Sequence, residues 1–168
     1  MEKVKTLKNI ISKELSAIIG GALFIAILSK LAMFLPFTPV PVTMQTLAAL
    51  LVGAALGKKG VLSVVTYIAL GMLGLPIINA GMFTAGYIVG FVIAAYVIGW
   101  MFDTKLVHNV STSFLAFTFG EIIILSCGAV WLSFFVENAF SLGIVPFIPG
   151  TLFKICLAVY ITKMIKKW

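Results

Sequence analysis

Long apolar stretches separated by short polar ones make up nearly the whole chain. Six such stretches can be marked, at residues 15–35, 44–57, 61–75, 86–102, 114–136 and 147–165. A helix needs about 20 mostly apolar residues to cross the hydrocarbon core of a bilayer, and most of the six approach that length. The spacing therefore predicts six helices that cross a membrane.

The second and third stretches, 44–57 and 61–75, are short for a full crossing. Two interpretations remain open for them. Either both helices are tilted through a locally thin region, or 44–75 is partly re-entrant, which is tolerated only where protein or a water-filled cavity surrounds the backbone. Six spans is the preferred count.

Composition agrees with a membrane protein. Of the 168 residues, 62% are hydrophobic and only 10% are charged, and the mean hydropathy is +1.20. A soluble core of this size could not bury so much apolar surface. No linker-like segment divides the chain, so we expect one all-α integral membrane domain over residues 1–168.

The net charge of +7 comes from lysine alone, because the chain contains no arginine. Cytoplasmic loops of membrane proteins carry an excess of basic residues. With the N-terminus inside, ten of the twelve lysines fall in cytosolic segments: Lys3, Lys5, Lys8, Lys13, Lys58, Lys59, Lys105, Lys163, Lys166 and Lys167. The outward segments 36–43, 76–85 and 137–146 contain none. This asymmetry predicts a multi-pass protein of the cell membrane with both termini in the cytosol, and it argues against nucleic-acid binding.

No catalytic or metal-binding set is recognisable. The single histidine, His108, has no cysteine or acid at ligand spacing, and both cysteines fall in apolar stretches. A phosphate-binding glycine loop is also missing from the sequence. We therefore expect neither an enzyme nor a cofactor.

The three outward segments are apolar with a few polar side chains, as in the lining of a small-molecule site. The first, PFTPVPVT at 36–43, is too rich in proline for a helix and is expected to fold back as an ordered cap. The third leads into the last helix, which contains Lys154. A lysine inside a membrane span is costly unless it is paired, reaches water or binds an anion.

Four blocks carry a resemblance to a known family. They read PFTPVPVTMQTL at 36–47, LGLP at 73–76, TAGYIVGF at 84–91 and LGIVPFIPGTLFK at 142–154. The chain resembles the BioY family, the biotin-binding S components of energy-coupling factor transporters, over nearly its whole length. The first and last blocks are the specific ones, because hydrophobic helices alone match many families.

The resemblance implies a six-helix bundle that binds biotin from outside. It also implies docking on a membrane-embedded coupling subunit driven by two ATPase subunits. Lys154 stands where the family has a lysine that binds the carboxylate, through a charge-assisted hydrogen bond. Gln45 and Asn79 are candidates for the ureido group, since an amide both donates and accepts. Tyr87 is a candidate for the pocket wall.

One departure from the family concerns the ligand. Thr151 is also a candidate ligand-binding residue. It replaces the acid of the Pro-Gly-Asp sequence that is usual in the family. If that acid normally accepts from the ureido group, another small carboxylated or heterocyclic solute is the alternative ligand. A membrane scaffold without any ligand is the alternative outside transport.

Each candidate also has a purely structural interpretation. Lys154 could pair with Glu121, the one acid deep inside an apolar stretch. Gln45 could brace the second helix, and Asn79 could shape a turn.

Small residues on the first helix favour close approach of another helix. Ala22 and Ala26 are predicted to dock on the coupling subunit, with packing inside the bundle as the alternative. Gly86 and Gly90 are the better candidates for packing inside the bundle.

Overall fold

The computed structural model describes residues 2–75 and 81–166, with side chains from Ile10 onward. The described chain is almost entirely helical. Its α-helices are α1 (Glu2–Ser29), α2 (Gln45–Leu56), α3 (Gly60–Met72), α4 (Ala85–Asp103), α5 (Val110–Leu132), α6 (Ala139–Gly143) and α7 (Ile148–Lys166). Short 3-10 helices are η1 (Gly57–Lys59), η2 (Met82–Thr84) and η3 (Val145–Phe147), and two strands are β1 (Ala32–Met33) and β2 (Val42–Thr43).

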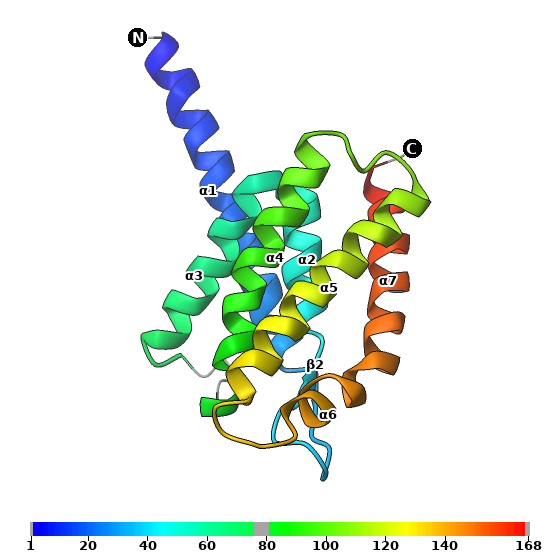
Figure 1. The fold of residues 1–168 in the computed structure, drawn as a ribbon. Coiled ribbons are helices and arrows are strands. Elements are labelled where there is room, and N and C mark those ends of the chain that lie inside the picture. Colours follow the sequence, from blue (N-terminus) through cyan, green and yellow to red (C-terminus); the bar gives the residue numbers. More distant parts are fainter. Residues whose placement is uncertain (1, 76–80, 167–168) are drawn as a thin grey trace.

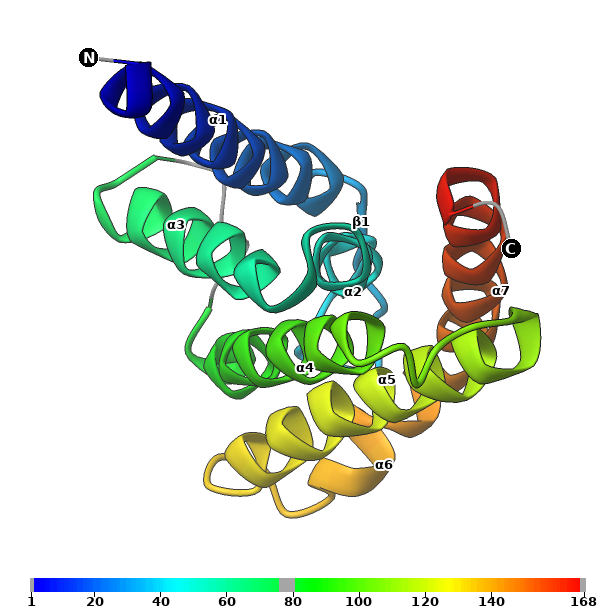
Figure 2. The ribbon, with the colours of Figure 1, turned by 90° about the horizontal axis from the view of Figure 1, so that it is seen from above.

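The long helices lie side by side and run between two ends of the molecule (Figure 1). The first turns of α1 and the last turn of α7 lie at the same end, together with η1 and the connection from α4 to α5. The opposite end carries β1, β2 and α6. From above, α1 covers α3, α4 packs between the α2–α3 pair and α5, and α7 contacts α2 and α5 (Figure 2).

Five helical stretches in the described residues are long and apolar enough to cross a membrane: Ile10–Ser29, Gln45–Met72, Met82–Asp103, Val110–Leu132 and Ala139–Lys166. Gln45–Met72 covers most of both short predicted stretches, and η1 divides it into α2 and α3. The chain turns at Gly57, whose φ of 62° lies in the left-handed region that favours glycine. A side chain there would also displace the carboxylate of Asp103 on α4, which accepts from the amide of Lys58.

The first helix differs from its predicted range of 15–35. It begins at Glu2 and ends at Ser29, so the predicted C-terminal end is wrong. Residues 31–44 form a hairpin instead: Ala32 pairs with Thr43 and Met33 with Val42, and the amide of Met44 donates to the carbonyl of Leu31. Pro36 disfavours helical geometry at Leu35, the predicted last residue of this helix. The hairpin confirms that segment 36–43 folds back.

A second difference concerns residues 137–146, which were expected to be a loop. They contain α6 and most of η3, and both are short. Thr38 in the hairpin donates to the carbonyl of Leu142 at 2.7 Å, so this segment and the hairpin are joined across the same end of the bundle. The end of the molecule opposite the two termini is therefore closed by two folded segments.

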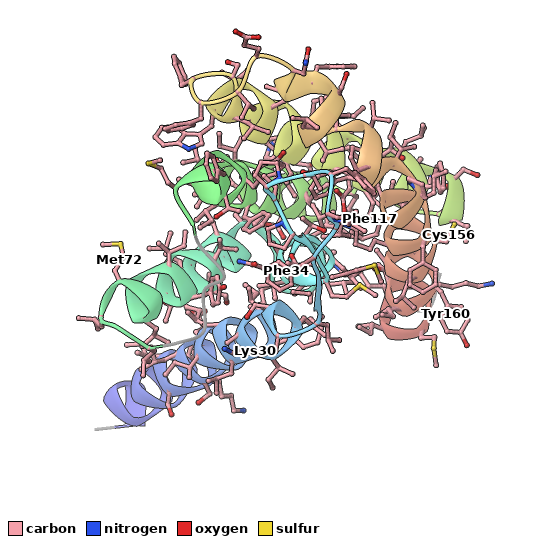
Figure 3. The ribbon with its side chains drawn as sticks, turned by 90° about the horizontal axis from the view of Figure 1, so that it is seen from below. Lys30, Phe34, Met72, Phe117, Cys156 and Tyr160 are labelled. Atoms are coloured by element: carbon pink, nitrogen blue, oxygen red, sulfur yellow. The ribbon has the colours of Figure 1, made fainter. Side chains whose placement is uncertain are left out.

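The outer surface of the bundle is apolar. Figure 3, viewed from the hairpin end, shows Met72 on α3 and Tyr160 on α7 pointing away from the bundle, whereas Phe117 lies within it. A continuous apolar exterior suits lipid and would be a liability in water.

Inside the bundle, the prediction for Gly86 and Gly90 is confirmed. A Cβ atom on Gly86 would meet Trp131 at 2.1 Å, and one on Gly90 would meet Ile124 at 2.8 Å. The two glycines therefore allow the close contact between α4 and α5.

Candidate ligand-binding site

A cavity lies inside the bundle near the hairpin end and is called the inner cavity here. Its wall is formed by the hairpin, the first turn of α2, the start of α4, and single residues of η2, α5, η3 and α7. The apolar lining residues include Val40, Phe91, Leu125 and Phe147, and the polar ones include Thr43, Gln45, Thr46, Thr84, Tyr87 and Lys154. Its volume is about 30 Å³, enough for roughly two water molecules.

Lys154 supplies the positive charge of this cavity. Pro149 lies in the first turn of α7, where its missing N–H costs nothing, and Lys154 follows five residues later. The side chain is only 4% exposed. Its Nζ atom donates to Oγ1 of Thr46 on α2 at 2.6 Å. A buried ammonium with one short hydrogen bond and a cavity beside it is suited to bind an anion.

Glu121 lies on the other side of the same lysine. Its Oε1 atom is 3.6 Å from Nζ of Lys154, and the side chain is 1% exposed. Neither carboxylate oxygen has a hydrogen-bond partner among the described residues. The two interpretations of Lys154 given above are therefore compatible, because the lysine pairs with Glu121 and also borders the cavity.

The position of Gln45 is likewise compatible with both roles considered for it. Its side chain lines the inner cavity, and its Nε2 atom donates to the hydroxyl of Tyr67 on α3 at 2.9 Å. Tyr67 is fully buried but does not line the cavity. Gln45 thus braces α2 against α3 while presenting part of its amide to the cavity.

Tyr87 lines the inner cavity. Its ring stacks on Phe147 with the ring centres 5.8 Å apart, and its hydroxyl donates to the carbonyl of Gly143 at 2.7 Å. Gly128 on α5 makes room for this ring, since a Cβ atom there would lie 2.2 Å from it. The tyrosine hydroxyl is therefore occupied by backbone, and its ring is the surface offered to a ligand.

Two of the predicted site residues, Thr151 and Asn79, are not among the described residues that line the cavity. Thr151 is not a lining residue, and its buried hydroxyl has no hydrogen-bond partner within the described chain. Asn79 falls within 76–80, outside the described residues, so its role stays a prediction.

The predicted docking residues, Ala22 and Ala26, are not on a free surface. Ala22 is 1% exposed and Ala26 is 8% exposed, and α1 packs against α2 and α3. The structure therefore favours the alternative of packing inside the bundle. Ala17 and Gly20, also on α1, border an open groove with Leu51 and Ile161, between α1, α2 and α7. We call it the α1–α7 groove.

Sequence reasoning did not select Thr46, Thr84 or Phe147. Thr46 lies next to Gln45 inside a recognised block, but nothing in that block indicates that it contacts a lysine 108 residues later. Phe147 lies in the last block, from which only Thr151 and Lys154 were selected. Across the described parts of the chain, no three histidine, cysteine or acidic side chains gather as metal ligands.

These features define a class of protein. A helical bundle with an apolar exterior and a buried, partly polar cavity containing one ammonium group is a multi-pass membrane protein with a site suited to a small anionic solute. The comparison with known sequences gives the family: the BioY family model matches residues 1–168, and the chain belongs to the BioY family.

Several relatives are similar over most of their length. The chain is 35% identical to the "Biotin transporter BioY" of Thermotoga maritima, covering 79% of this chain and 85% of that one. It is 34% identical to the "Probable biotin transporter BioY" of Pyrococcus horikoshii, with 92% and 97% covered. A solved structure described as "the S-component for biotin from an ECF-type ABC transporter" superposes with a TM-score of 0.83, at 29% identity, covering 95% of this chain and 94% of that one.

Proposed function

We propose that this protein captures biotin as the substrate-binding S component of an ECF-type importer in the cell membrane. It is a transport protein, like the relatives named above, and not an enzyme. The observation that carries the proposal is Lys154, a buried ammonium group on the wall of an internal cavity. Biotin has one carboxylate, a neutral hydrogen-bonding ring and an apolar chain, and the cavity offers a partner for each.

The ligand groups can be assigned by their chemistry. The carboxylate binds Nζ of Lys154, because a charge-assisted hydrogen bond is strongest where water is excluded. The ureido group contacts the amide of Gln45, with Asn79 as a further candidate partner. The rings of Tyr87 and Phe147 pack against the apolar part of the ligand.

A ligand larger than two water molecules requires the wall to move. The hairpin contributes Val40, Pro41 and Thr43 to the wall and contains no membrane helix, and a hydrogen bond from Thr38 to Leu142 ties it to α6. We infer that the hairpin moves outward to admit biotin and closes over it. Ligand then favours the closed form only through contacts that the open form lacks.

The orientation follows from the lysines. Lys58, Lys59, Lys105, Lys163 and Lys166 all belong to the end of the bundle at which α7 finishes. Basic residues favour the cytosolic side, so both termini are cytosolic and the inner cavity lies towards the outside. In this arrangement α2 and α3 are separate crossings and the bundle has six membrane helices, tilted or in a thinned bilayer because α2 and α3 are short.

The α1–α7 groove is the proposed docking surface for the coupling subunit of the importer, which in turn is driven by ATPase subunits. Its small residues, Ala17, Gly20 and Gly21, would let a partner helix approach closely. It replaces Ala22 and Ala26 in this role. Gly20 has open space where a Cβ atom would be, so Gly20→Leu should fold.

Gly20→Leu tests the docking surface. We expect it to abolish co-purification with the coupling complex while biotin binding is unchanged. Ala69→Leu, on the exposed face of α3, is the matched control and should assemble normally. Normal assembly of Gly20→Leu would rule out this groove.

Binding of biotin by the purified chain tests the main proposal. Titration calorimetry in detergent or nanodiscs should give saturable binding, and biotin at about 100 times its dissociation constant should stabilise the fold by about 2.7 kcal/mol. If no small molecule raises the thermal midpoint, the alternative of a membrane scaffold without a ligand is favoured.

A related solute is the second candidate, favoured by Thr151 in place of the family's acid. A panel of vitamins competing against labelled biotin separates the two. Failure of unlabelled biotin to compete in that panel would support this candidate.

A further inference from the structure

Glu121 is the described acid that is buried within the bundle, on α5. Glu14, Asp103 and Glu137 are exposed. Its carboxylate lies 3.6 Å from Nζ of Lys154 and receives no hydrogen bond from the described residues. A buried carboxylate that accepts no hydrogen bond is held in its charged form mainly by its partner's charge, so whatever changes Lys154 changes Glu121.

The surroundings of Glu121 contain no second cation in the described chain. Thr46 on α2 and Thr151 on α7 are the hydroxyl groups that face it.

The titratable side chains on α4 are either hydrogen-bonded elsewhere or exposed. Tyr87 donates to Gly143, Tyr96 is exposed, and Asp103 accepts from the amide of Lys58. On α7, Cys156, Tyr160, Lys163 and Lys166 are exposed, and α6 has no titratable side chain. Glu121 and Lys154 therefore form an isolated neutral pair.

A carboxylated ligand at Lys154 would break this neutrality. Two carboxylates would share one ammonium group and leave an uncompensated negative charge inside the membrane, where a charge is expensive. Like charges that share a site cannot both remain ionised, and the cheapest relief is protonation of one of them. The ligand carboxylate stays ionised because it then forms the ion pair with Lys154, so the proton goes to Glu121.

We propose that the binding of an anionic ligand at Lys154 is accompanied by the uptake of one proton from solution by Glu121. The inference rests on the proposed function in one respect, that a ligand carboxylate binds Lys154. The site is then neutral in both states, as Lys154 with an ionised Glu121 before binding and as Lys154 with the ligand carboxylate and a protonated Glu121 after it. A neutral site loses no binding energy to an uncompensated charge in lipid.

Calorimetry of biotin binding in buffers of different ionisation enthalpy measures this proton directly. The slope of binding enthalpy against buffer enthalpy should correspond to the uptake of roughly one proton for the unaltered chain near neutral pH. Glu121→Gln should reduce the slope to near zero while still binding biotin. Glu137→Gln, an exposed acid of the same chemistry, should keep the slope of the unaltered chain.

A neutral ligand provides the second arm. The primary amide of biotin brings no carboxylate, so its binding to the unaltered chain should take up no proton. If Glu121→Gln does not fold, infrared difference spectra of the unaltered chain decide instead: biotin should produce the carbonyl band of a newly protonated carboxylic acid, and the amide should not.

The outcomes are distinguishable. Absence of biotin binding would reject the proposed function and this inference with it. Tight biotin binding without proton uptake would reject the inference alone, and persistence of the full slope in Glu121→Gln would show that another group takes the proton.

Discussion

The two ends of the helix bundle are built on different principles. At the end that carries the termini, helices are joined by short segments such as η1, and charged groups interact at the surface, where Lys59 pairs with Glu14 and the amide of Lys58 donates to Asp103. At the opposite end the connections are longer, fold into the hairpin and α6, and enclose a cavity with a buried ammonium group. The first end only connects the helices, and the second forms the candidate binding site.

The two ends differ in what their charged groups cost the fold. Exposed ion pairs contribute little to stability, because water screens them and already solvates their charges. A buried charge is different, since it costs several kcal/mol unless it is matched. The lysine side chains described at the first end are exposed and solvated by water, whereas the buried Lys154 at the second end requires partners. Mutations at the two ends should therefore have different consequences.

The largest difference is expected between two lysines. Lys154→Met should lower biotin affinity by roughly 10- to 100-fold, because hydrogen bonds to charged groups contribute about 1.5–3 kcal/mol. Lys59→Met, at the other end, should leave affinity unchanged. Titration calorimetry measures both.

Loss of folding must be separated from loss of binding in this experiment. Lys154→Met leaves the carboxylate of Glu121 buried without its partner, which is itself destabilising. The double variant Lys154→Met with Glu121→Gln removes that charge and should recover thermal stability without recovering affinity. Full biotin binding by either variant would show that Lys154 does not bind the ligand.

Gly57→Ala should affect stability and not biotin affinity, in contrast to the loss of affinity expected for Lys154→Met. It introduces a Cβ atom at a left-handed φ and within 2.0 Å of a carboxylate oxygen of Asp103. We expect a loss of stability of about 1–3 kcal/mol, seen as a lower thermal midpoint, with unchanged affinity for biotin. Gly20→Ala, which meets open space, is the control that should not lower the midpoint. A drop in affinity for Gly57→Ala would mean that the two ends are coupled.

A pair of substitutions tests which role of Gln45 matters. Gln45→Leu removes the cavity amide and the bond to Tyr67, whereas Tyr67→Phe removes that bond and leaves the amide in place. If Gln45 binds ligand, Gln45→Leu should weaken biotin by about 10-fold, and Tyr67→Phe should not. Equal losses in both variants would indicate that Gln45 only braces α2.

The smallest effect is expected at the tie between the hairpin and α6. Thr38→Val removes the hydrogen bond to Leu142 and keeps the size of the side chain. The net value of such a bond is about 0.5–1.5 kcal/mol, so opening of the hairpin should become roughly 2- to 10-fold easier. Stopped-flow measurements should show faster biotin association and dissociation. Unchanged rates would mean that the ligand does not pass the hairpin.

Much of this arrangement was predictable from the sequence. The predicted ranges 44–57, 61–75 and 86–102 correspond closely to α2, α3 and α4. Gln45, Tyr87 and Lys154 were selected from family-like blocks, and the structure brings all three to one cavity. The end of α1 was misplaced, because the apolar residues 30–35 suit a membrane helix and a hairpin at its mouth equally well.

The rotation of each helix about its axis was not predictable. Ala22 and Ala26 were expected to face a partner, yet they face the bundle, while Ala17 and Gly20 border the open groove. Small residues are spaced similarly in both sets, so spacing alone does not distinguish them. The same limit applies to Glu121, whose approach to Lys154 depends on how α5 is turned towards α7.

By itself, the sequence determined that this is a multi-pass helical membrane protein, approximately where its helices lie and which end carries the lysines. These properties depend on hydropathy and charge summed over short segments. Only the tertiary structure decided that Lys154 meets Thr46 and Glu121 beside a cavity. In a soluble protein an apolar stripe marks the inner face of a helix, but in lipid the inner and outer faces are both apolar. The partners across the bundle are therefore set by packing, which no local pattern records.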